Sequence, residues 1–391
     1  MTEKTSIYLD HNATTPVHID LYKKISEVAL QWGNPSSVHS HGRGPKQLIR
    51  IARKSLANFF SVHPLEIIFT SGGSEANNTA IFSVFENEWL KNKNYSAEFI
   101  TTNIEHPSVS KAFDLIESYG AKVHRVPVNY DGVFDMDYYK SVLNENTKLV
   151  SVMYANNETG ALLPINEVIS LAKNVNAFVH CDAVQALGKV EINLKSLNVD
   201  YCSFSAHKVY SLKGSGALYI KTGVPLNSLI VGGAQERSRR AGTENTLAIA
   251  SFGYALELIK DIKIKYDHQL NLRNLMEEQI IKNIQDCFVL SKTAERLPNT
   301  SNVVFDNIDG ESLLMNLDLK GISVSTGAAC SSGSSEPSPV LINMGLTRYQ
   351  AQSSLRVSLG WSTTEAEVNL FVETLVAIVS RLRRLKQESA V

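Results

Sequence analysis

Lys208 follows a short run, residues 200–205, whose β-rich pattern predicts a buried strand. An ammonium group just beyond a buried strand is costly unless it is paired or deprotonated. A deprotonated lysine can form a Schiff base with a carbonyl group. Because most lysines after strands are simply solvated, this segment alone leaves both interpretations open.

Asp182 precedes Lys208 in sequence and stands just after another predicted strand, residues 177–181. One crossover between parallel strands would bring the two side chains to the same rim of a sheet. A carboxylate beside a pyridinium nitrogen keeps that nitrogen protonated, which pyridoxal phosphate needs to act as an electron sink. The competing interpretation is an N-capping aspartate with Gln185 hydrogen-bonded nearby.

The segment Ser-Gly-Gly-Ser-Glu at residues 71–75 follows a third predicted strand, 66–70, and begins a helical pattern. Backbone N–H groups and the helix dipole could hold a phosphate there. Taken alone, the segment fits a plain glycine turn equally well. A phosphate cradle, Asp182 and Lys208, in this order and each after a strand, together favour a cofactor site.

Cys330 lies in a segment rich in Ser, Gly and Ala, residues 323–338. Small residues favour a mobile arm, and about ten flexible residues span roughly 17 Å, enough to carry a thiol from a substrate to an external acceptor. Composition alone would also fit an incidental cysteine. The chain has 4 cysteines and no Cys-x-x-Cys pair, and for the other three we expect buried structural roles.

Strands and amphipathic helices alternate along the first part of the chain, which predicts an α/β fold with a mostly parallel sheet and helices on both faces. The expected strands are 66–70, 98–102, 122–128, 148–154, 177–181, 200–205 and 216–220, and the expected helices between them include 107–119 and 165–173. A long helical pattern at 243–284, with Thr243 as N-cap, leads to a second domain. Its expected elements are strands 301–305 and 355–359 and helices 311–317 and 364–385.

The composition is that of a globular protein of 391 residues, 43% hydrophobic and 20% charged. Its 38 basic and 39 acidic residues give a net charge of −1, so nucleic acid is not the expected partner. The sequence shows neither an apolar run long enough for a membrane helix nor a signal pattern at its start. We therefore expect a soluble cytoplasmic enzyme with no membrane partner.

With these residues in place, the sequence resembles the cysteine desulfurases, fold-type-I pyridoxal phosphate enzymes similar to the class-V aminotransferases. The resemblance covers nearly the whole chain. It is carried by residues 8–16, 33–37, 71–78, 105–106, 156–160, 182–185, 205–208, 240–245 and 355–360. The resemblance implies a large cofactor domain at 16–258 and a smaller α+β domain, formed by 1–15 and 259–391, that carries the cysteine loop.

Roles for individual residues follow from the resemblance only. It implies that Lys208 forms the Schiff base with pyridoxal phosphate, Asp182 pairs with the pyridine nitrogen and Gln185 hydrogen-bonds the ring hydroxyl. His106 would stack on the ring and Asn157 would lie beside it. Four residues would hold the phosphate, and a fifth would join them from the second subunit of a homodimer: Gly73, Ser74, Ser205 and His207, with Thr243 from the partner. Arg356 and Asn34 would bind the substrate carboxylate.

The activity implied is removal of sulfur from L-cysteine, which gives L-alanine and a persulfide on Cys330. Lys208 or His106 would move the α-proton. The long loop is similar to that of the branch that feeds iron–sulfur assembly, with a scaffold protein as sulfur acceptor, and Cys330 would be a transient ligand of a nascent cluster.

Two departures and several alternatives remain at the level of sequence. The chain ends soon after residues 383–386, without the longer tail of members that dock a cluster scaffold, and Ser211-Leu212 replaces a common Gly-Pro. A selenocysteine lyase or cysteine-sulfinate desulfinase would share the cofactor residues, and an aminotransferase of the same fold would not need Cys330. From another class, the chain could be a catalytically silent sulfur-relay protein.

Overall fold

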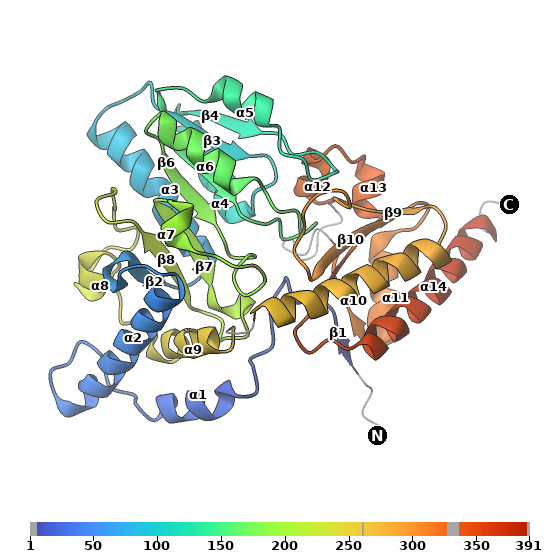
Figure 1. Cartoon of the computed structure of the whole chain (residues 1–391), viewed down its shortest axis with the longest axis horizontal. Coiled ribbons are helices and arrows are strands. Elements are labelled where there is room, and N and C mark those ends of the chain that lie inside the picture. The colour runs from blue at the N-terminus through green and yellow to red at the C-terminus, as the bar shows by residue number, and fades with distance from the viewer. Residues whose placement is uncertain (1–5, 260–261, 327–335, 389–391) are drawn as a thin grey trace.

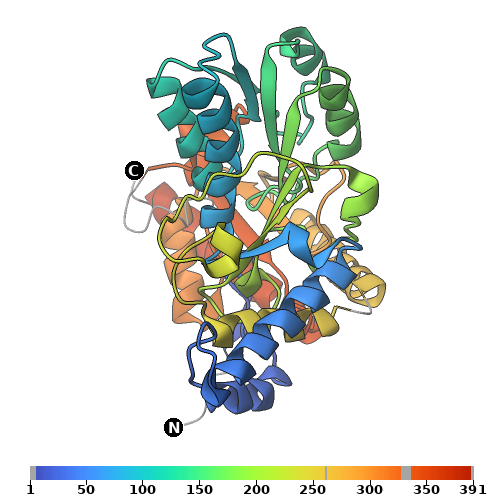
Figure 2. The same ribbon diagram turned by 90° about the vertical axis from the view of Figure 1, so that its left-hand side faces the viewer.

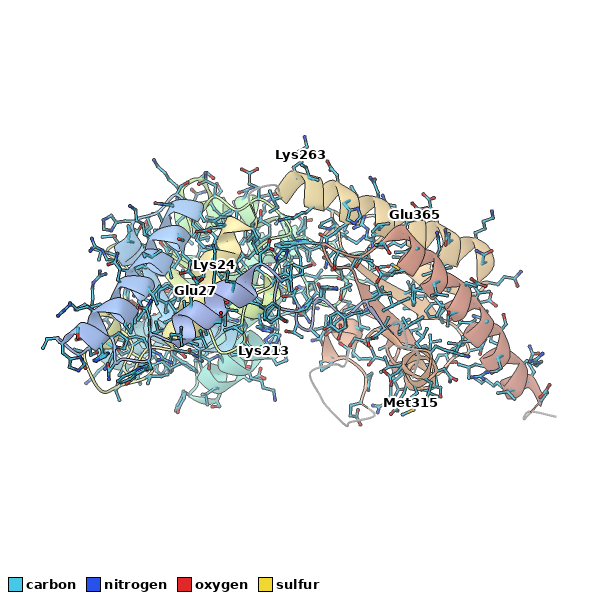
Figure 3. The ribbon with its side chains drawn as sticks, turned by 90° about the horizontal axis from the view of Figure 1, so that it is seen from below. Lys24, Glu27, Lys213, Lys263, Met315 and Glu365 are labelled. Atoms are coloured by element: carbon cyan, nitrogen blue, oxygen red, sulfur yellow. The ribbon has the colours of Figure 1, made fainter. Side chains whose placement is uncertain are left out.

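The computed structural model describes residues 6–259, 262–326 and 336–388. The elements form two lobes: a large one built on a twisted sheet, and a smaller one in which α10 (Ile262–Asn283) and α14 (Glu365–Glu388) lie side by side (Figure 1). Viewed from below, Lys24 on α1 (Leu21–Ala29) marks the first lobe, whereas Met315 on α11 (Gly310–Leu319) marks the second (Figure 3).

The sheet of the large lobe has seven strands in the order β2-β8-β7-β6-β5-β3-β4. Their bounds are β2 (Ile67–Thr70), β3 (Glu98–Thr102), β4 (Lys122–Val126), β5 (Thr147–Met153), β6 (Phe178–Asp182), β7 (Tyr201–Ser205) and β8 (Gly216–Ile220). Only β8 runs antiparallel to its neighbours, β2 and β7. The predicted α/β fold with a mostly parallel sheet is confirmed.

Helices cover both faces of this sheet because its strand residues point alternately to opposite sides. Ile68 of β2 packs with α3 (Gly73–Phe85) and α4 (Pro107–Ser118) in one core cluster. Its neighbour Phe69 packs with α2 (Ser40–Phe59), α6 (Ile165–Asn174) and α9 (Thr246–Glu257) in another. Helix α2 lies against α9 (Figure 2). Residues on both faces of the sheet are therefore buried, including polar ones such as Thr101 and Ser203.

The smaller lobe combines an antiparallel sheet, β12-β10-β9, with a short parallel pair, β1 and β11. The bounds are β1 (Ile7–Tyr8), β9 (Cys287–Val289), β10 (Thr300–Phe305), β11 (Ile322–Ser323) and β12 (Ser354–Ser358). Its core joins Ile7 and Leu9 from the start of the chain to residues of α10, α11 and α14. The domain boundaries expected from the sequence stay a prediction.

The remaining elements are short. They are η1 (Pro64–Glu66), η2 (Glu86–Lys91), α5 (Met136–Val142), α7 (Leu194–Leu197), η3 (Ala206–Lys208), α8 (Gln235–Ser238), α12 (Pro339–Asn343) and α13 (Arg348–Gln352). Within the described part of the chain, no helix has the length and apolar character needed to cross a bilayer.

The expected helix at 243–284 is two helices, α9 and α10, and Thr243 is not the N-cap. Asn245 caps α9 instead, because its side chain accepts a hydrogen bond from the backbone N–H of Ala248 at 3.1 Å. Asn and Thr cap helices almost equally well, so residue type did not separate them. Helix α9 is buried over most of its length, whereas α10 buries only a few residues along one side.

Candidate active site

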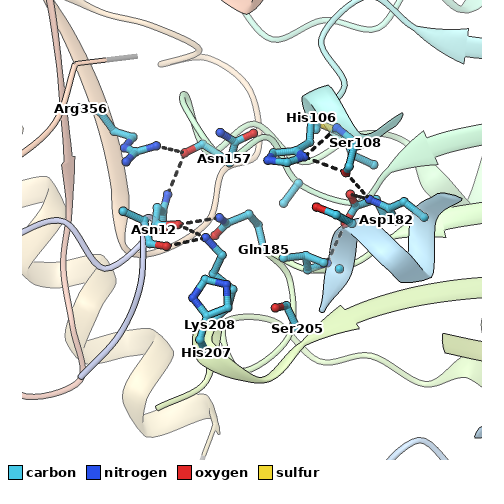
Figure 4. Close-up of a pocket in the computed structure, with 17 residues that line it drawn as sticks. Asn12, His106, Ser108, Asn157, Asp182, Gln185, Ser205, His207, Lys208 and Arg356 are labelled. Atoms are coloured by element: carbon cyan, nitrogen blue, oxygen red, sulfur yellow. Dashed lines mark hydrogen bonds between the residues drawn. The ribbon is translucent and has the colours of Figure 1, made fainter. Parts of the chain in front are cut away.

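A cavity of about 300 Å³ lies at the carboxyl ends of β5, β6 and β7, and loop residues 12–13 close one side of it (Figure 4). Crevices at this edge are where open α/β sheets bind ligands. The cavity brings together most of the site residues that the sequence predicts: Gly73, Ser74, His106, Asn157, Asp182, Gln185, Ser205, His207, Lys208 and Arg356. Residues from six separate segments thus meet in one place.

Asp182 is the last residue of β6 and is buried. Its Oδ2 accepts a hydrogen bond from Asn77 Nδ2 at 2.7 Å, and its Oδ1 accepts one from the backbone N–H of Val184 at 3.0 Å. Both bonds fix the orientation of the carboxylate. The sequence did not predict this hydrogen bond of Asn77, although residues 71–78 are among those that carry the resemblance.

Lys208 ends the short helix η3 directly after β7. Its Nζ donates hydrogen bonds to the backbone oxygens of Asn12 at 2.6 Å and Ala13 at 2.8 Å. These acceptors are neutral, so the amine is held in place at the cavity wall by carbonyl groups. The contact also explains why the strand β1 region, far away in sequence, belongs to the site.

His106 caps helix α4 and faces the cavity. The backbone N–H of Ser108 donates to its Nδ1 at 3.1 Å, so the neutral ring carries its proton on Nε2. Burial lowers the pKa of His106, and Lys208 lowers it further, against the opposing effect of Asp182. The ring is thus held neutral, with Nε2 as its proton-bearing nitrogen.

The end of the cavity at the start of α3 suits a phosphate. Helix α3 begins at Gly73, and its N-cap, Gly72, supplies no side-chain hydrogen bond. A Cβ on Gly73 would lie 2.7 Å from Val184 Cγ2, so glycine is needed for this close approach. The uncapped N–H groups, with Ser205 and His207 beside them, form a cradle that a dianion would fill.

Arg356 on β12 is buried and comes from the smaller lobe. Its Nη2 donates to Asp10 Oδ1 at 2.7 Å and its Nη1 to the backbone oxygen of Asn157 at 3.2 Å. Its Nε and the Oδ1 of Asn157 are both buried without a partner. Unpaired buried polar atoms are costly, so a polar ligand that bonded to either atom would remove that cost.

Three predicted residues are not placed at this cavity. Asn34 lies in an exposed loop, where its Oδ1 accepts a hydrogen bond from the backbone N–H of Ser36 at 2.9 Å. Thr243 borders a separate cavity of about 200 Å³ with Arg240. Cys330 lies outside the described residues, and its role stays a prediction.

The described residues include no cluster of three or more His, Cys, Asp or Glu side chains that could hold a metal ion. A part for Cys330 as a cluster ligand is untested, because residues 327–335 are not described.

Comparison with known proteins agrees with this geometry. Residues 7–371 match the family model described as aminotransferase class-V. A cysteine desulfurase from Nostoc sp. is 42% identical over 381 residues, which cover 97% of this chain and 94% of that protein.

Solved structures give the same picture. A NifS-like protein matches with a TM-score of 0.89 and 35% identity, covering 96% of this chain and all of that one (100%). A structure titled SspA in complex with cysteine matches with a TM-score of 0.79 and 30% identity, over 90% of this chain and 99% of its own. The predicted resemblance is confirmed: the chain belongs to the class-V aminotransferase family, within which it is a cysteine desulfurase.

Proposed function

We propose that this enzyme uses pyridoxal phosphate to remove sulfur from L-cysteine and places that sulfur on Cys330. The observation that carries the proposal is the meeting of Asp182, Lys208, His106 and Arg356 around one cavity of about 300 Å³. The cysteine bound by the related SspA structure supports L-cysteine as the substrate.

The residues present fit the cofactor. Asp182, held rigid by its two hydrogen bonds, suits the pyridinium nitrogen. The start of α3 with Ser205 and His207 suits the phosphate, and Gln185 suits the ring hydroxyl. Lys208 would anchor the aldehyde carbon. When bound, pyridoxal phosphate supplies an electron sink for the substrate Cα, which no side chain provides.

The substrate carboxylate is assigned to Arg356. Its planar fork is already oriented by Asp10 and by the backbone of Asn157, so little side-chain entropy is lost on binding. Burial of this guanidinium strengthens the interaction and excludes water from it. The amino acid is thereby oriented with its α-carbon toward Lys208 and His106. Asn34 as a second carboxylate ligand stays a prediction.

Proton movement at the substrate is assigned to Lys208 and His106 on the cavity wall. Lys208 Nζ sits among neutral carbonyl acceptors, and His106 presents Nε2 while Ser108 holds Nδ1. The lowered pKa of His106 keeps its ring neutral, so its Nε2–H serves as a hydrogen-bond donor. We propose that Lys208 acts at the α-carbon and that His106 exchanges the proton near the substrate sulfur.

Transfer of sulfur is assigned to the Cys330 thiolate. Its sulfur forms a bond to the substrate sulfur while the carbon–sulfur bond breaks, and the electron pair of that bond stays with the carbon skeleton, which leaves as alanine after protonation. The described chain on either side supports this: Ser325 pairs with Arg356 through two backbone hydrogen bonds, and Ser338 Oγ donates to Glu158 Oε2 at 2.6 Å. Both flanks therefore lie beside the residues around Asn157.

The enzyme is proposed to work as a homodimer that delivers sulfur to an acceptor protein for iron–sulfur assembly. Large apolar side chains are exposed near α1 and the loop after it, with Leu30 at 79%, Trp32 at 77% and Val38 at 92% exposure. Such a patch is typical of a protein interface. Thr243, which borders no part of its own chain's main cavity, is assigned to the partner's phosphate site.

The test is alanine release from L-cysteine in the presence of a thiol reductant, measured for the loaded parent protein and its Cys330→Ala variant. We expect alanine from the parent only. Equal release by both proteins would point to a selenocysteine lyase type of reaction. Release by neither would favour an aminotransferase or a silent sulfur-relay protein.

A further inference from the structure

Lys189 is a buried lysine that has no part in the chemistry above. Its side chain is only 5% exposed, and its Nζ donates to Gln185 Oε1 at 2.5 Å and to Asn12 Oδ1 at 2.9 Å. No carboxylate among the described residues lies within ion-pair distance of it. A buried lysine without a counter-ion is costly, so its retention calls for a physical reason.

The local sequence places this lysine under the cavity. Residues 183–190 form successive turns after β6, closed by backbone hydrogen bonds such as Leu187 N–H to Ala183 O. Gly188 then takes a φ of +76°, a conformation that glycine adopts most easily, and the next residue is Lys189. The result is that Lys189 and Gln185, four residues apart, converge on Asn12.

The surroundings favour a neutral amine. Burial lowers the pKa of Lys189 well below its ordinary value, and the nearby cations Lys208 and Arg356 lower it further. The third titratable neighbour is His11, whose own pKa is lowered to about 4 by burial and then by Lys189. A neutral amine has two N–H donors, and the two amide oxygens of Gln185 and Asn12 match them.

This contact fixes which way the Gln185 amide points. Because Oε1 accepts from Lys189, Nε2 is turned toward the cavity side, where it donates to the backbone oxygen of Asn12 at 3.0 Å. That same carbonyl receives Lys208 Nζ. If Lys189 were absent, the Oε1 atom would be buried without a donor and the amide would lose its preferred orientation.

Asn12 is oriented in the same way. Its Oδ1 accepts from Lys189 and also from Asn299 Nδ2 at 3.2 Å, so its Nδ2 is left to donate to the backbone oxygen of Asn157 at 3.1 Å. The network therefore runs from the Lys208 end of the cavity to the Arg356 end, with Lys189 as its buried donor.

We propose that Lys189 is a positioning residue that holds Gln185 as a hydrogen-bond donor to the phenolic oxygen of bound pyridoxal phosphate. The proposal rests on the proposed function, since it takes Lys208 and Gln185 to hold that cofactor. A donor on the phenolic oxygen stabilises its anionic form and weakens its grip on the Schiff-base proton. Lys189 thereby lowers the pKa of the Schiff base that Lys208 forms.

The test is a pH titration of the visible absorption of the loaded protein, which reads the Schiff-base proton without turnover. For Lys189→Met we expect the Schiff-base pKa to rise by about one unit, the equivalent of one lost hydrogen bond. Lys173→Met is the matched control: Lys173 is a partly buried lysine paired with Asp200, away from the cavity. It should lose stability with no change in the titration.

A double-mutant cycle with Gln185→Leu shows whether Lys189 acts through Gln185. Gln185→Leu alone should raise the Schiff-base pKa, and adding Lys189→Met should raise it no further. Additive shifts would mean that Lys189 acts by its own charge, and an unshifted Lys189→Met would overturn the proposal outright.

The Lys189→Gln variant and the parent protein give two further outcomes. If Lys189→Met does not fold, Lys189→Gln replaces it, with a smaller shift expected in the same direction and an unchanged pKa counting against the proposal. A parent protein without a pH-dependent visible band would overturn the proposed function, whereas a normal parent with an unaltered variant would overturn only the role of Lys189.

Discussion

Arg356 combines two features that are unusual for an arginine, near-complete burial and an unpartnered Nε. Lysine at this position would keep the charge beside Asp10 but lose the planar fork. We predict that Arg356→Lys raises KM for L-cysteine by about 10- to 100-fold, because hydrogen bonds to charged groups contribute roughly 1.5–3 kcal/mol. Steady-state kinetics measure it.

The matched control is Arg125→Lys, which alters a surface ion pair with Asp114 and Glu117. Exposed pairs contribute little, so its KM should equal that of the parent. An Arg356→Lys enzyme with an unchanged KM would remove Arg356 from the carboxylate site.

Asp182 is the residue whose charge the proposed chemistry needs most. Asp182→Asn keeps the size of the side chain and one acceptor oxygen but cannot hold a pyridinium proton. We predict a fall in kcat of at least about 10-fold, the low end for loss of a charged hydrogen bond, and a changed visible spectrum of the bound cofactor. Unchanged turnover would contradict the assignment of Asp182 to the ring nitrogen.

Glu105 links the strands β3 and β5. Its Oε1 accepts from Thr102 Oγ1 on β3 at 2.7 Å and from the backbone N–H of Met153 on β5 at 2.9 Å, while its Oε2 is buried without a partner. Burial raises the pKa of Glu105 to about 8, with Asp182 adding to the rise and the two hydrogen bonds opposing it. The folded protein therefore holds a proton here that the unfolded chain releases.

The raised pKa of Glu105 determines how the free energy of unfolding changes with pH. Between the ordinary pKa of about 4.5 and about 8 the folded state binds the extra proton, so this stabilisation is present at low pH and is lost as the pH rises through about 8. We predict that Glu105→Gln makes the free energy of unfolding less dependent on pH. Urea titrations at about pH 5 and about pH 8.5 check this, and an equally steep decline in the variant would contradict it.

The close approach of Gly73, at the start of α3, to Val184 can be tested by substitution. In Gly73→Ala the new Cβ meets Val184 Cγ2, and overpacking of this kind typically costs about 1–3 kcal/mol. We predict weaker retention of pyridoxal phosphate, by about 5- to 150-fold, measured by absorption at limiting cofactor. Val184→Ala makes room, so the double variant should recover binding; failure to recover would place the effect elsewhere.

The elements themselves were largely predictable, because buried parallel strands are short apolar runs followed by turn residues. Strands β3 and β8 were predicted to the residue, while the break between α9 and α10 was not, since helical periodicity continues on both sides of it. The cavity residues were predictable as a set from the segments that carry the resemblance, such as 205–208, but Asn12 and Asn77 were not given roles. Lys189 stands outside those segments, and its contact with Asn12 depends on how the chain folds back.

At the scale of the whole molecule, the two lobes share the site: Arg356 comes from the smaller one and Lys208 from the larger. A second subunit is part of the proposed function. We predict that Trp32→Glu shifts the protein from dimer to monomer and lowers activity, because the exposed apolar patch near α1 would carry a charge. Light scattering after size-exclusion chromatography measures the mass.

The control is Ile264→Glu, at an exposed residue of α10 (70% exposed) on the opposite lobe. It should remain dimeric and active. A parent that is monomeric and fully active would contradict both the dimer and the assignment of Thr243 to a partner's site.

We propose that sulfur from L-cysteine comes to rest on Cys330, and mass spectrometry of the loaded protein after exposure to L-cysteine without reductant would detect it there. We predict that the peptide containing Cys330 gains one sulfur atom, and that the alanine released equals the sulfur bound. Alanine released with Cys330 unmodified, or sulfur found on Cys287 instead, would contradict the account.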